Sequence, residues 1–170
     1  MATHRISILG ANTIPDATGR AFFEPYSVKA TNDIFRHLVG VLNDPAAAQA
    51  HGFYGQFPIP KNYVGTASVV VVWTSTAITG NFRSRFQYRA VGGDDAESLD
   101  QATFQETVNV TDVAPGATDR RMAASFTLTA ANLAVDDSVT FLYERFDDTG
   151  TDTIAAAVTI HDILFQYNDA

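Results

Sequence analysis

Apolar and polar residues alternate with a period of two through most of the chain after residue 60. Successive side chains of a β-strand point to opposite sides, so this period is typical of strands with one buried face. In the clearest case, one face would carry Phe82, Ser84, Phe86 and Tyr88, and the other Arg83, Arg85, Gln87 and Arg89. Further strands are expected at 64–74, 103–110, 122–128 and 155–167, and at 139–146, which is apolar or aromatic on both faces, as in a central strand of a sandwich.

Short turn sequences separate these segments and leave no room for long helices. Ala114-Pro115-Gly116 is one such turn, and only 130–133 is expected to form a single helical turn. Six strands in this arrangement predict an all-β fold, an antiparallel jelly-roll-like β-sandwich, and exclude a parallel α/β sheet. The length of 170 residues favours one domain.

The first sixty residues are less regular, and the sequence divides into an N-terminal part, 1–60, and a sandwich, 61–170. Strands are expected at 5–9 and around Phe22. A short helix is expected to begin after Thr31 or Asn32 and to end before Pro45. The segment 45–60 is interpreted as an extended connection or arm, because long irregular stretches in small domains often serve contacts.

Composition removes several classes of protein. The chain has no cysteine, which excludes thiol nucleophiles, disulfides and zinc–cysteine sites. Its longest apolar run, 69–73, is far shorter than the roughly 20 residues that cross a bilayer, so no membrane partner is expected. The first residues lack the pattern of a secretory signal, which disfavours export by the general route.

Charge is divided unevenly along the chain, whose net charge is -8. Residues 1–90 hold eight basic and four acidic residues, whereas 91–170 hold three and fifteen. This polarity suits self-association, although it is also compatible with an ordinary surface. An acidic chain disfavours direct nucleic-acid binding.

Signals of catalysis are few. The four histidines, His4, His37, His51 and His161, show no metal-ligand spacing and are expected to be structural or on the surface. No phosphate-binding glycine loop and no nucleophile elbow are present. The chain is therefore expected not to be an enzyme, with a hydrolase built from two distant carboxylates as a minor alternative.

Two weaker binding signals remain. A polar hairpin offers carboxylate ligands of the kind that Ca²⁺ prefers, from Asp147, Asp148 and Asp152, although a solvated turn explains them as well. Trp73 or Tyr54 could provide a flat platform for a sugar, although aromatic residues at alternating positions more often form a core. No other cofactor is indicated.

Several segments resemble small jelly-roll proteins of tailed-bacteriophage virions. The similarity rests on 60–65 leading into the valine-rich strand that ends at Trp73, on 133–139, on 145–148, and on the closing strand 163–167. It covers about residues 58–168 and does not extend to 31–56. The resemblance implies a non-enzymatic virion protein, assembled in the host cytoplasm, of the head decoration or cementing type, which forms trimers on the major capsid protein. A tail-fibre or a receptor- or glycan-binding module is the alternative.

On the virion hypothesis, the protein acts by binding neighbouring copies. Arginines of one strand face are expected to pair with acids of another copy, and aromatic residues of the N-terminal part are expected to be buried against neighbours. The charged candidates are Arg83, Arg85, Arg89, Asp94, Asp95 and Glu97, and the aromatic candidates are Phe22, Phe23, Phe53 and Tyr54.

Overall fold

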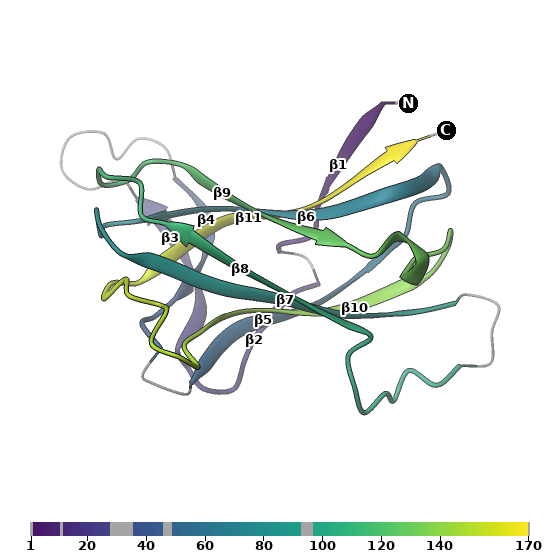
Figure 1. Cartoon of the computed structure of the whole chain (residues 1–170), viewed down its shortest axis with the longest axis horizontal. Coiled ribbons are helices and arrows are strands. Elements are labelled where there is room, and N and C mark those ends of the chain that lie inside the picture. The colour runs from purple at the N-terminus through teal and green to yellow at the C-terminus, as the bar shows by residue number, and fades with distance from the viewer. Residues whose placement is uncertain (1, 11, 28–35, 46–48, 93–96, 170) are drawn as a thin grey trace.

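The computed structural model describes residues 2–10, 12–27, 36–45, 49–92 and 97–169, and the described chain forms two antiparallel sheets packed face to face (Figure 1). This confirms the predicted all-β sandwich. The strands are β1 Thr3–Ser7, β2 Ile14–Pro15, β3 Ala21–Ser27, β4 Arg36–Leu42, β5 Ala50–Pro58, β6 Tyr63–Ser75, β7 Asn81–Val91, β8 Glu106–Val113, β9 Met122–Leu128, β10 Ser138–Phe146 and β11 Val158–Asp169.

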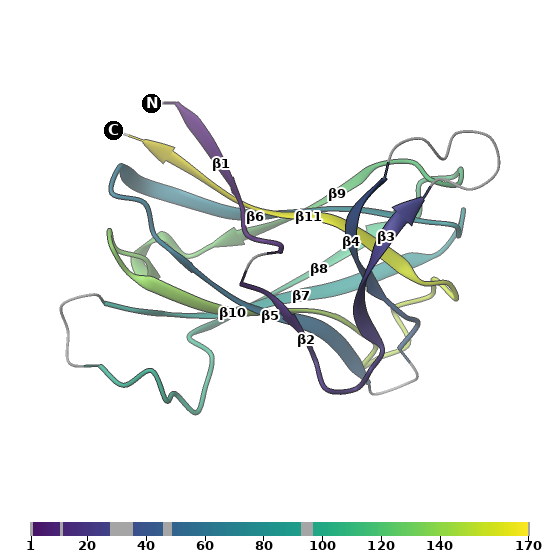
Figure 2. The ribbon, with the colours of Figure 1, turned by 180° about the vertical axis from the view of Figure 1, so that it is seen from behind.

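Sheet A has the strand order β3-β4-β11-β6-β9, and β1 also pairs with β11. Strand β11 is long enough to hold two partners along one edge, because β4 pairs with 158–160 and β1 pairs with 164–168. The pairing of β1 with β11 places the two ends of the described chain side by side, as both views show (Figures 1 and 2).

Sheet B has the order β2-β5-β10-β7-β8. Strand β10 lies at its centre, between β5 and β7, as expected of a segment that is apolar on both faces. The predicted alternation of β7 is confirmed, since Phe82, Phe86 and Tyr88 are fully buried between the sheets and the arginines lie on the other face. The predicted turn at 130–133 is a 3-10 helix, Ala130–Asn132.

The helix predicted to end before Pro45 is wrong where the structure describes it, because residues 36–42 form strand β4. Val39 and Val41 are β-branched residues on one face of this strand, paired with β3. Gly40 lies on the other face, where an added Cβ would stand 2.7 Å from the ring of Phe53. The proposed capping residues, Thr31 and Asn32, lie outside the described residues.

The extended connection predicted at 45–60 contains strand β5, which pairs with β2 and β10 inside sheet B. Its alternation is real but is hidden by glycine: Phe53, Gly55 and Phe57 are buried, whereas Tyr54 and Gln56 are exposed. An added Cβ on Gly55 would collide with the ring of Phe141. In their described parts, residues before position 60 therefore supply strands to both sheets rather than a separate arm.

Within the described ranges, no helix has the length and apolar character needed to cross a membrane.

Candidate functional site

The outward face of sheet B carries side chains that are buried although they do not belong to the core between the sheets. On β10, Leu142 and Phe146 are only 5% and 3% exposed, yet both lie outside the interior cluster formed by their neighbours Phe141 and Tyr143. Because the described chain forms only these two sheets, neighbouring side chains must enclose them. We call this surface the β10 groove, and define it by the outward residues Tyr54, Arg85, Gln87, Arg89, Thr140, Leu142, Glu144 and Phe146; side chains fill its middle, and its hollows are two pockets at the ends.

Two pockets mark the ends of the β10 groove. One, of about 140 Å³, lies between Arg89, Thr140 and the exposed ring of Phe104. The other, of about 190 Å³, is lined by Arg85 and Phe146. At about 3.3 Å per residue, the stretch of β10 from Thr140 to Phe146 spans roughly 20 Å. This length suits an extended ligand with several repeating units.

A hydrogen-bonded network occupies the middle of the groove. Arg85 Nε and Gln87 Nε2 both donate to Glu144 Oε2, at 2.6 and 2.8 Å. The guanidinium of Arg85 also lies 4.7 Å from the centre of the Phe146 ring, a cation–π contact that fixes its plane. The Arg85 amino groups and Glu144 Oε1 make no hydrogen bond to another described residue, which leaves donors and an acceptor for a ligand.

Tyr54 provides an exposed aromatic surface beside this network. It is 43% exposed and stands directly opposite Leu142 on β10 and Ile14 on β2, so the three side chains form one row across the sheet. A flat ring next to an apolar floor can contact the C–H face of a sugar, while the neighbouring polar groups bind its hydroxyls. The sequence prediction identified Tyr54, but it gave no sign of Glu144 or Gln87 beside it.

Trp73, the other predicted sugar platform, cannot serve as one because it is fully buried between the sheets. Its ring packs 4.8 Å from that of Phe82, and its Nε1 donates to Asp112 at 3.0 Å. The period-two pattern of β6 placed Trp73 on the inward face with Val69 and Val71, and this signal was available in the sequence.

The arginines predicted to bind a neighbouring copy have contacts within their own chain. Arg83 pairs with Asp148 at 3.4 Å, Arg85 pairs with Glu144 at 2.6 Å, and Arg89 donates to the Thr103 carbonyl at 3.5 Å. Of their proposed acidic partners, Glu97 is exposed, and Asp94 and Asp95 lie outside the described residues.

The aromatic interface candidates fall into different environments. Phe53 is fully buried in the sandwich and packs 4.9 Å from Phe23, so it cannot be buried against a neighbouring subunit. Phe22 and Phe23 are partly buried on β3, at the edge of sheet A. Tyr54 is the exposed member of the set.

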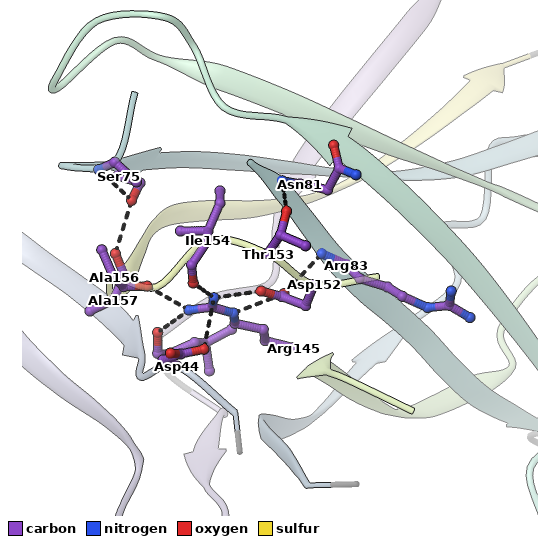
Figure 3. A network of polar contacts seen from close by, with 12 residues as sticks. Asp44, Ser75, Asn81, Arg83, Arg145, Asp152, Thr153, Ile154, Ala156 and Ala157 are labelled. Atoms are coloured by element: carbon purple, nitrogen blue, oxygen red, sulfur yellow. Dashed lines mark hydrogen bonds and ion pairs between the residues drawn. The ribbon is translucent and has the colours of Figure 1, made fainter. Parts of the chain in front are cut away.

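The acidic hairpin proposed for Ca²⁺ is held by arginine instead (Figure 3). Both side chains of the Asp152–Arg145 pair are fully removed from solvent, and the two Asp152 oxygens accept from Arg145 at 2.6 and 3.0 Å. Asp152 also accepts from the backbone N–H of Arg83. Asp152 is therefore an internal counterion of Arg145 rather than the predicted cation ligand. Asp148, another predicted ligand, pairs with Arg83. In the described ranges, no three His, Asp or Glu side chains are grouped to hold a metal.

Comparison with known proteins identifies the fold. No family model matches the chain, and no curated protein matches its sequence. Among solved structures, the chain is similar to the family 11 carbohydrate-binding module of Clostridium thermocellum Lic26A-Cel5E, with a TM-score of 0.52 and 6% identity over 96% of this chain and 94% of the module. It is also similar to the CBM22-1 xylan-binding domain of Paenibacillus barcinonensis Xyn10C, with a TM-score of 0.51 and 10% identity over 98% of this chain and 94% of that domain. A third similar structure is CBM35 from Cellvibrio japonicus Abf62, with a TM-score of 0.50 and 13% identity over 99% of this chain and 95% of the other. The chain therefore shares the β-sandwich fold of these modules.

Proposed function

We propose that this chain is a carbohydrate-binding module that holds a neutral oligosaccharide in the β10 groove. The observation that carries the proposal is the Arg85–Glu144–Gln87 network beside the exposed ring of Tyr54. The fold supports it, since one structure of similar fold is a xylan-binding domain and another holds a β-1,3-1,4-mixed-linked tetrasaccharide.

The charges at the centre of the groove favour a neutral ligand over an acidic one. Glu144 compensates the positive charge of Arg85 there, and Asp148 compensates that of the nearby Arg83, whereas Arg89 at the far end donates to the Thr103 carbonyl. Planar side chains that are already oriented can donate to and accept from adjacent sugar hydroxyls with little further loss of entropy. Binding of this kind needs no catalytic group, which is consistent with the expectation of a non-enzymatic protein.

The experiment is a binding screen with soluble neutral polysaccharides, among them xylan and mixed-linkage β-glucan, by affinity gel electrophoresis, followed by calorimetry on the best ligand. Tyr54→Ala and Arg85→Ala should each weaken binding by roughly tenfold or more, as expected for central contact residues. Tyr26→Ala is the matched control, since Tyr26 is an aromatic residue on sheet A and should not affect the groove.

Two results would overturn the proposal. One is a screen in which no neutral polysaccharide binds. The other is a ligand whose affinity is unchanged in both groove variants, or is lost in Tyr26→Ala alone, because the binding site would then lie elsewhere.

The virion hypothesis, with a trimer cementing a capsid or a module on a tail fibre, remains a prediction. Measurement of oligomer mass at low and high salt, together with binding to capsids, tests it independently of sugar binding.

A further inference from the structure

Three aromatic side chains meet on the outward face of sheet A, on the opposite side of the molecule from the β10 groove. They are Tyr26 of β3, His37 of β4 and His161 of β11. The His37 and His161 ring centres are 5.2 Å apart, and Tyr26 lies 5.4 Å from the first and 4.7 Å from the second. Packing against Tyr26 therefore restricts both imidazoles.

The two imidazoles face each other through nitrogen atoms. His37 Nε2 lies 2.9 Å from His161 Nδ1, and His161 Nε2 lies 2.9 Å from the hydroxyl of Thr74, a residue that is 5% exposed. When His161 Nε2–H donates to Thr74, its Nδ1 lone pair points toward His37. A hydrogen bond at one ring nitrogen that orients the other is a common feature of histidine metal ligands.

We propose that His37 Nε2 and His161 Nδ1 together bind a divalent late transition metal ion such as Cu²⁺, Ni²⁺ or Zn²⁺. The metal takes the place of the hydrogen between the two nitrogens, and His37 then carries its ring proton on Nδ1. Metal–nitrogen bonds of about 2.0–2.1 Å in a tetrahedral site separate the two nitrogens by roughly 3.3 Å, so the exposed His37 has to move slightly outward and turn its ring until both lone pairs meet at the metal.

The surroundings of the pair suit a metal that keeps some of its water. The described residues offer no group of three His, Asp or Glu ligands, so water completes the coordination. A cavity of about 530 Å³ lies next to the pair, lined by Tyr26 and Thr74 and by Glu24 and Asp119; neither histidine lines it, but the two acidic residues place negative charge near the site.

Binding would join two strands that are otherwise weakly connected. Strand β4 pairs with β11 through residues 158–160 alone, and β3 is held to sheet A through β4. A metal between His37 and His161 would bridge β4 and β11 and stabilise the folded state by mass action.

The test is calorimetric titration of the untagged full chain with ZnCl₂, NiCl₂ or CuCl₂ alone. We expect one ion per chain. His37→Ala and His161→Ala should each weaken binding tenfold or more, and Thr74→Val, which removes the orienting hydroxyl, should weaken it by roughly 10- to 100-fold. His4→Ala is the control, because His4 lies on β1 beside Asp169 and should leave the affinity unchanged.

Electron paramagnetic resonance of the Cu²⁺ complex gives a second readout, which reports the ligand atoms directly. The wild-type spectrum should show coupling to two imidazole nitrogens, and each single histidine variant should show coupling to one. Absence of two-nitrogen coupling, or equal affinity in the wild type and in both variants with unchanged melting temperatures, would overturn the proposal.

Discussion

Arg145 and Asp152 form a two-point ion pair in which both side chains are fully removed from solvent. Arg145 Nη2 also donates to the carbonyl of Ile154, and Nη1 donates to that of Ala156, so the guanidinium holds the segment between β10 and β11 in place (Figure 3). A buried charge that loses its partner keeps its desolvation cost, which makes this pair a sensitive point of the fold.

Asp152→Ala should lower the free energy of unfolding by about 3–5 kcal/mol, because it removes the buried carboxylate of Arg145 and leaves only the half-exposed Asp44, at 3.5 Å, as a counterion. Urea unfolding followed by tryptophan fluorescence measures the change. Asp148→Asn is the control: Asp148 is 53% exposed in its pair with Arg83, and its loss should cost less than about 1 kcal/mol. Equal effects of the two substitutions would contradict the structural role given to Asp152.

Trp73 and Tyr54 should respond to mutation in opposite ways. Trp73→Phe leaves Asp112 without the indole donor and should destabilise the fold by about 1–3 kcal/mol, with no change in the affinity for a polysaccharide that Tyr54→Ala weakens. Thermal unfolding and calorimetry on the same samples separate the two effects. Loss of affinity in Trp73→Phe at a temperature where it is fully folded would argue against a ligand site confined to the outward face.

Gly52→Ala should disturb both the fold and the groove. An added Cβ would clash with the Tyr143 carbonyl oxygen and stand 2.6 Å from Glu144 Cγ, so β5 and β10 would have to separate. Overpacking of this kind costs about 1–3 kcal/mol, and displacement of Glu144 should also weaken ligand binding. Gln56→Ala, on the exposed face of the same strand, should stay within about 0.5 kcal/mol of the wild type.

Glu106 should make stability depend on pH in the acidic range. Burial alone would raise the pKa of Glu106, but hydrogen bonds from Tyr88, Thr129 and Asn132 outweigh it and lower the pKa below its usual value. A carboxyl whose pKa is lower in the folded state stabilises the fold above the unfolded-state pKa, and this contribution is lost as the pH falls through the folded-state pKa.

The measurement compares unfolding of the wild type and Glu106→Gln at pH 7 and at pH 3. We expect a clear advantage of the wild type at pH 7 that shrinks toward pH 3. A difference that stays constant with pH would show that the charge of Glu106 contributes nothing.

The sequence predicted the sandwich because its strongest signal, the alternation in β7 and β9, follows directly from the geometry of a strand. It failed at β5 because glycine hid the pattern: Gly52 and Gly55 stand where larger residues would collide with β10. It failed at β4 because Leu38, Val41 and Leu42 also fit a helical spacing, and only pairing with β3 and β11 decides between the two.

The candidate site was predicted only in part, for a similar reason. The aromatic character of Tyr54 marked it as a possible sugar platform, and strand periodicity placed Arg85 on an outward face, where it was expected to bind a neighbouring copy. The contact of Arg85 with Glu144, and that of His37 with His161, join residues 59 and 124 positions apart, and these depend on strand order, which local patterns do not encode.

The pairing of β1 with β11 has a consequence for how this chain can be attached to other chains. Ala2 and Asp169 are joined by a hydrogen bond, and both lie on sheet A, the layer that faces away from the β10 groove. Polypeptide linkers fused at either end would begin side by side at sheet A, so neither should cover the β10 groove on sheet B. A circularly permuted version, with these ends linked by a few residues, should keep the same architecture.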